Sequence, residues 1–209
     1  MKIVVTLESS SASRTEDVMN ALKGYGHETS SISSKDSYQL NYMHTALISA
    51  LLLNAKRADL IVGGCGTGHG FNIAVSQYPG IFCSLIIQPV DIWLSMQINV
   101  PNCISLVLNK GYGWVSDVNL KFIFEKMFSI TEPGCGFPKH RKELQKEARK
   151  LLADISVKAH VPMAQALKSI NHDFVKYTLL APGMKELLEV DVIEDADLKK
   201  TLQDLYASY

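Results

Sequence analysis

The chain has 209 residues, of which 47% are hydrophobic and 20% are charged, and its 21 basic and 21 acidic side chains cancel to a formal net charge of zero. This composition is typical of a folded globular protein and excludes a disordered chain. Because a neutral chain has no overall basic field, we expect no nucleic-acid partner and no membrane partner.

The cysteines and the apolar runs indicate a cytoplasmic protein. The sequence has no Cys-x-x-Cys pair and no close cysteine–histidine cluster, so we expect free thiols and no metal site. Its first residues lack the long apolar region of a signal peptide. The longest apolar stretch, residues 46–53, is well short of the roughly 20 residues that span a bilayer.

Short apolar runs alternate with longer amphipathic stretches, a pattern that predicts β-α-β units around a sheet buried on both faces. We expect five strands in a mainly parallel sheet, at residues 3–7, 27–32, 60–62, 81–87 and 104–108. Helices are expected at residues of about 14–23, 42–54, 91–97 and 118–128. A further helix should follow the glycine-rich loop at residues 63–70 and end near residue 77. The sequence therefore predicts an α/β fold.

The composition changes after residues 131–138. Strand-like runs stop, and apolar residues recur at helical spacing as far as the C-terminus. We therefore expect a sandwich domain at residues 1–136 and a helical C-terminal extension at residues 137–209. The extension could form a lid, pack on the core or contact another subunit.

The densest motif is the loop at residues 63–70, which has five glycines in eight residues between a predicted strand and a predicted helix. Anions bind at such strand ends because helix N-termini present free N–H groups. The glycine spacing matches the dinucleotide fingerprint only loosely, and no acidic residue follows about 20 positions later. A nucleotide-dependent oxidoreductase is therefore disfavoured.

Cys65 lies inside this loop, where a helix N-terminus lowers the pKa of a thiol. It is a candidate base or nucleophile. The alternative is a small residue selected for a tight turn. Cys83 and Cys103 fall in strand-like runs and are expected to be inert core thiols, whereas Cys135 lies in a turn.

Residues 65–74, Cys-Gly-Thr-Gly-His-Gly-Phe-Asn-Ile-Ala, followed by Gly80-Ile81, resemble the signature of the ribose-5-phosphate isomerase B and galactose-6-phosphate isomerase family. Residues 41–46 and 94–102 resemble two further family segments in register. The resemblance covers about residues 1–150. It implies a Rossmann-like three-layer αβα sandwich and a homodimer or tetramer whose active sites are shared between subunits.

The resemblance also implies a sugar-phosphate aldose-ketose isomerase that acts through a cis-enediolate without a metal or organic cofactor. This chemistry needs a base, an anion hole and an acid, and the glycine-rich loop suits these roles. Cys65 would be the base and Thr67 a hydroxyl that binds sugar oxygens or relays the proton. The anion hole would comprise Gly66, Gly68, His69 and Gly70.

Three positions depart from the family pattern, and two of them lose a histidine of the site. The chain has Glu8 and Ser9 where relatives carry aspartate and histidine, and Ile98 before Asn99 where they carry the histidine associated with sugar-ring opening. Ring opening would then use His69, His44 or water, or the substrate would be open-chain. The substrate therefore need not be ribose 5-phosphate.

Further candidate residues come from the matching segments. Those expected to bind substrate are Glu8, Ser9, Tyr42 and Asn99. Those expected to hold the phosphate, by reaching the neighbouring subunit's site, are Lys139, His140 and Arg141.

Each of these assignments has a plainer alternative. Glu8 could cap the next helix, Tyr42 and His44 could serve packing alone, and the basic cluster could be a solvated helix turn. For the whole chain, the alternative is a non-catalytic sugar-phosphate binder. Retention of Cys65 and Thr67 argues against it, because a pure binder does not need a thiolate.

Overall fold

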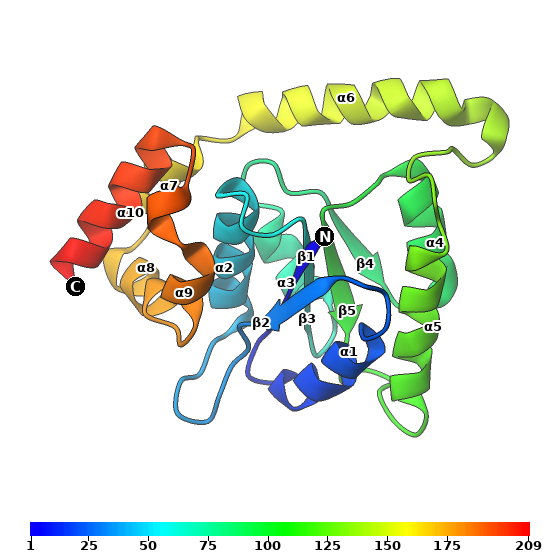
Figure 1. Cartoon of the computed structure of the whole chain (residues 1–209), viewed down its shortest axis with the longest axis horizontal. Coiled ribbons are helices and arrows are strands. Elements are labelled where there is room, and N and C mark those ends of the chain that lie inside the picture. The colour runs from blue at the N-terminus through cyan, green and yellow to red at the C-terminus, as the bar shows by residue number, and fades with distance from the viewer.

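Five short strands form a wholly parallel sheet in the computed structural model, which describes residues 1–209 (Figure 1). The strands are β1 (Lys2–Leu7), β2 (Glu28–Ser31), β3 (Leu60–Cys65), β4 (Cys83–Ile86) and β5 (Cys103–Val107). Their order across the sheet is β2-β1-β3-β5-β4. Because the strands are parallel, all five end at the same side, here called the carboxyl edge, and begin at the amino edge.

Helices cover both faces of this sheet, so the predicted three-layer αβα sandwich is confirmed. A short 3-10 turn, η1 (Ala12–Arg14), leads into α1 (Thr15–Ala21), which shares one face with α4 (Pro89–Ile98) and α5 (Ser116–Phe128). The other face carries α2 (Tyr42–Asn54) and α3 (His69–Val75). Alternate strand residues feed the two cores: Val4 and Ile61 point to the α2 side, and Val5 and Val62 to the α1 side.

The observed strand β3 is longer than expected. Gly63 and Gly64 remain in the ladder, opposite Ser105 and Leu106 of β5, so the strand ends at Cys65. Glycine has a low intrinsic preference for strands, and here pairing with two neighbouring strands decides the conformation. Cys65 is therefore the last strand residue, and the loop proper begins at Gly66.

The C-terminal extension is helical, as expected. Its elements are η2 (Lys139–Arg141), α6 (Lys142–Ala159), α7 (Met163–Ser169), α8 (His172–Leu179), α9 (Met184–Leu188), η3 (Val190–Val192) and α10 (Ala196–Ser208). Helix α6 runs from beside α4 across the molecule, and α7–α10 gather beside α2 (Figure 1). Val175, Met184 and Leu202 of these helices are fully buried in one cluster with Leu51 of α2. No helix is both long enough and apolar enough for a membrane span.

Helix α3 can approach β3 closely because residue 63 is a glycine and has no side chain. A β-carbon at residue 63 would overlap the ring of Phe71, which is completely buried. The ring therefore packs directly on the backbone of β3. This contact holds α3 close to the strand whose end carries Cys65.

We expect Gly63→Ala to lower the free energy of unfolding by about 1–3 kcal/mol, because the new methyl group forces the Phe71 ring out of its place. Urea unfolding would measure the loss. Gly113→Ala is the matched control, since a β-carbon there meets nothing within 4 Å. Equal effects of the two substitutions would contradict the close packing of Phe71 on β3.

Candidate active site at the carboxyl edge

Cys65 ends β3 at the carboxyl edge and is almost buried, with 6% of its surface exposed. Its Sγ lies 4.0 Å from Oγ1 of Thr67. Backbone hydrogen bonds tie the loop to the end of β5: Leu108 N–H donates to the Cys65 carbonyl at 3.2 Å, and Asn109 N–H donates to that of Gly66 at 3.0 Å. The thiol and hydroxyl are thus held together on a fixed stretch of backbone.

Gly68 turns the chain from the strand into α3. Its φ of +73° is in the left-handed region that favours glycine, and a β-carbon there would lie 2.6 Å from Cδ1 of Leu85. The turn leaves four amides of the loop without backbone partners, those of Gly66, Thr67, His69 and Gly70. Free amides beside a thiol are donors for a developing oxyanion.

Glu8 directly follows β1 and is 5% exposed. Its carboxylate accepts hydrogen bonds from the Ser10 N–H at 3.0 Å and from the Ser10 hydroxyl. These bonds fold the serine-rich turn back on the carboxylate. Glu8 does not cap the next helix, because the N-caps of η1 and α1 are Ser11 and Arg14 and neither end has a side-chain cap. Ser9, on the same turn, is exposed, and its N–H donates to the Leu40 carbonyl at 2.8 Å.

Tyr42 covers the glycine-rich loop from the first turn of α2. A β-carbon on Gly70 would lie 3.4 Å from Cγ of Tyr42, so the ring sits on the bare backbone of the loop. Asn41 caps α2: its Oδ1 accepts from the amides of Met43 and His44 at 3.0 and 3.1 Å. A local capping motif thus places Tyr42 against Gly70 of the glycine-rich loop.

His44 completes that capping box and is packed between aromatic rings. Its Nδ1 accepts a hydrogen bond from the Asn41 N–H at 3.1 Å. Its ring centroid lies 4.8 Å from that of Phe174 and 5.0 Å from that of Tyr177. Burial lowers the pKa of His44, which favours the neutral ring that can accept this bond. The structure gives His44 a capping and packing role.

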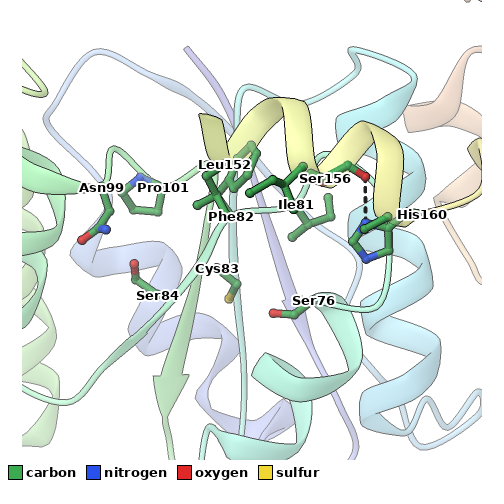
Figure 2. Close-up of a pocket in the computed structure, with 12 residues that line it drawn as sticks. Ser76, Ile81, Phe82, Cys83, Ser84, Asn99, Pro101, Leu152, Ser156 and His160 are labelled. Atoms are coloured by element: carbon green, nitrogen blue, oxygen red, sulfur yellow. Dashed lines mark hydrogen bonds between the residues drawn. The ribbon is translucent and has the colours of Figure 1, made fainter. Parts of the chain in front are cut away.

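The remaining candidates lie at the opposite edge. Asn99 is the C-terminal cap of α4 and lies four residues before Cys103, where β5 starts. It lines a cavity of about 330 Å³ beneath α6, together with Ser84, Ser156 and His160 (Figure 2). Asn99 therefore does not meet Cys65 within one chain.

Lys139, His140 and Arg141 form η2, also at the amino edge, and all three are exposed. The neighbouring segment packs on the end of α4, where Gly134 N–H donates to the Met96 carbonyl at 2.8 Å. The candidate residues of one chain therefore form two groups at opposite edges of its sheet, here called the cysteine half-site and the basic half-site.

Two residues that support the candidate half-sites were not predicted from the sequence. Asn109 follows β5 at the carboxyl edge, and its Nδ2 donates to the Ser10 carbonyl at 2.6 Å. Arg149 of α6 donates from Nη1 to the Ile98 carbonyl at 2.6 Å and so holds the end of α4. The position of Asn109 just after a parallel strand could have indicated its role, whereas nothing local distinguishes Arg149 among the basic residues of α6.

Of the other thiols, Cys103 is completely buried, and burial raises its pKa, in keeping with an inert core thiol. Cys83 is half-buried and lines the cavity at the amino edge. The structure groups no three His, Cys, Asp or Glu side chains in a way that could hold a metal ion.

The sandwich and its cysteine-bearing loop match the family model described as Ribose/Galactose Isomerase over residues 3–136. The chain belongs to the ribose/galactose isomerase family, and this membership supports a sugar isomerase activity. No curated protein matches the chain.

Two solved structures match this chain over almost its whole length. One is a 4-deoxy-L-threo-5-hexosulose-uronate ketol-isomerase complexed with a tartrate, with 31% identity and a TM-score of 0.93 over 99% of this chain and 100% of that one. The other is a ribose-5-phosphate isomerase from Vibrio parahaemolyticus, with 29% identity and a TM-score of 0.92 over 98% and 99% of the two chains.

A shorter structure shares the fold alone. The ribose 5-phosphate isomerase of Thermotoga maritima is 24% identical, with a TM-score of 0.56, and the match covers 97% of that chain but only 70% of this one. A large part of this chain therefore has no counterpart in the shorter enzyme.

The lowered pKa of His44 predicts a pH dependence of stability. Because the pKa of His44 is lower in the folded chain, protonation of His44 favours the unfolded chain. The stability that depends on neutral His44 is therefore complete above pH 6.5, the ordinary pKa of histidine, and is lost as the pH falls below this value. We expect the wild type to lose more free energy of unfolding between about pH 7.5 and pH 5 than His44→Gln, which keeps a side chain suited to a capping box. Urea titrations at several pH values would measure this, and equal losses would contradict a buried neutral His44.

Proposed function

We propose that the protein is a sugar-phosphate aldose-ketose isomerase that acts through a cis-enediolate with Cys65 as the base. The observation that supports this most directly is the Cys65 thiol beside Thr67 and four unpaired amides at one sheet edge. A binding protein has no use for a thiol at this position, whereas proton transfer next to a carbonyl requires a base and an anion hole.

In the proposed reaction, Cys65 removes the proton from carbon 2 of the open-chain aldose. The electron pair of that bond moves to form the carbon–carbon double bond of the enediolate, and negative charge develops on the former carbonyl oxygen. The amides of Gly66, Thr67, His69 and Gly70 donate hydrogen bonds to this oxygen. The proton returns to carbon 1, a hydroxyl proton passes between the two oxygens with the help of Thr67, and the ketose is released.

The basic half-site would be supplied by a second copy of the chain. Asn99 and Arg141 lie at the amino edge, away from Cys65 of their own chain. Arg141 is exposed, and its guanidinium can bind an anionic oxygen pair through two parallel hydrogen bonds. We therefore propose a homodimer or larger assembly with shared active sites, in which Arg141, with Lys139 and His140 beside it, holds the phosphate.

A specific observation favours a second substrate class. The match of 31% identity over nearly the whole chain, extension included, is to an isomerase named for a hexosulose uronate. A carboxylate offers Arg141 the same pair of oxygens as a phosphate does. Ile98 stands where the sugar-ring-opening histidine is expected, which suits a substrate that is already open-chain.

Solvent exchange tests the proposed chemistry. Deuterium incorporation at carbon 2, followed by NMR, would be compared across pentose phosphates, hexose phosphates and hexuronates for wild type and Cys65→Ala. We expect exchange on at least one sugar, reduced about 10²- to 10⁴-fold in Cys65→Ala because general base catalysis is lost. Exchange that persists in the variant would exclude Cys65 as the base, and detectable binding without exchange on any sugar would favour the non-catalytic binder.

We expect Arg141→Ala to raise KM about 10- to 100-fold for the anionic substrate, because one charge-assisted bidentate contact is lost. The effect on kcat should be small. Steady-state kinetics would measure both, with Lys150→Ala as control, since Lys150 pairs with Glu147 on α6 at 2.8 Å. An unchanged KM in Arg141→Ala would remove Arg141 from the anion site.

A further inference from the structure

The C-terminal extension reaches the carboxyl edge through α8, which lies beside α2 (Figure 1). There the ring of Tyr177 stacks on the ring of Tyr38, with centroids 4.5 Å apart and planes at 20°. The Tyr38 hydroxyl donates a hydrogen bond to the Tyr177 carbonyl. The Tyr177 hydroxyl donates in return to the Gln39 carbonyl at 2.9 Å. The two tyrosines form a reciprocal pair, here called the tyrosine clasp.

The clasp holds a backbone segment that supports two candidate substrate-binding residues. The residue after Gln39 is Leu40, whose carbonyl accepts the Ser9 amide at 2.8 Å. Asn41 follows and begins α2, and the next residue is Tyr42, whose ring lies on Gly70 of the cysteine loop. Gln39, which accepts the Tyr177 hydroxyl, is thus one residue before Leu40, the support of Ser9, and three residues before Tyr42.

The same helix fixes the first turn of α2 from its side. Phe174 and Tyr177, three residues apart on α8, both contact the His44 ring, whose Nδ1 accepts the Asn41 amide. Elsewhere the extension meets α2 through apolar side chains such as Val175 and Met184. The polar contacts of the clasp fall on the segment that borders the candidate site.

We propose that Tyr38 and Tyr177 are positioning residues through which the C-terminal extension holds Ser9 and Tyr42 in place for substrate binding. This inference rests on the proposed function for the identity of the site. The extension is therefore part of the binding apparatus of this chain, although it carries none of the reacting groups.

Tyr177→Phe tests the clasp, because it keeps the ring and removes only the hydroxyl that bonds to Gln39. Tyr206→Phe is the matched control: its hydroxyl also donates to a backbone carbonyl, that of Leu179 at 3.1 Å, but inside the extension. Amide hydrogen exchange at Ser9 is the first readout and needs no substrate. We expect Tyr177→Phe to speed exchange at Ser9 about fivefold, the factor that corresponds to one net hydrogen bond. Tyr206→Phe should leave it unchanged.

The second readout is steady-state kinetics. We expect Tyr177→Phe to raise KM several-fold with little change in kcat, whereas Tyr206→Phe leaves both unchanged despite a similar fall in melting temperature. Equal amide exchange rates at Ser9 in the two variants, or no increase over the wild type in either, would contradict the proposed role of the tyrosine clasp. Absence of turnover in the wild type would refute the proposed function instead, because the exchange measurement still reports on the clasp.

Discussion

The contact between the Phe71 ring and the bare backbone at Gly63 is the constraint on which the candidate site depends. Any side chain at residue 63 would occupy the place of that ring. Without the contact, α3 would stand further from β3, and the loop between them would lose its short path through the left-handed Gly68. The thiol of Cys65, the hydroxyl of Thr67 and the free amides are brought together because strand and helix approach so closely.

Three layers of support surround this loop. The residues just after β5 fix it through the amides of Leu108 and Asn109, and Tyr42 of α2 covers Gly70. The extension then secures the segment before α2 through the tyrosine clasp. The opposite edge carries Asn99 and Arg141 on surfaces exposed within one chain. A parallel sheet thus separates the two groups of candidate residues, and the proposed symmetric dimer would bring them together.

Much of the sandwich could be predicted, because strand periodicity and glycine-rich turns are local properties of the sequence. The full length of β3 was not predicted, because pairing across the sheet overrides the low strand preference of Gly63 and Gly64. Contacts between distant residues also escaped prediction. Arg149 reaches Ile98 across 51 positions, and Tyr177 reaches Gln39 across 138. Glu8 was identified, but only the fold shows its carboxylate already bonded to Ser10.

The most direct test of a shared active site mixes two variants and assays them at a substrate concentration well below KM, where each variant alone has little activity. One chain would carry Cys65→Ala, and the other would carry Asn99→Ala together with Arg141→Ala. If a site takes its base from one copy and its anion-binding groups from the other, random dimers should regain about a quarter of wild-type activity, since half of them hold one intact site. A mixture that stays as inactive as its components would place both half-sites in the same chain and contradict the account.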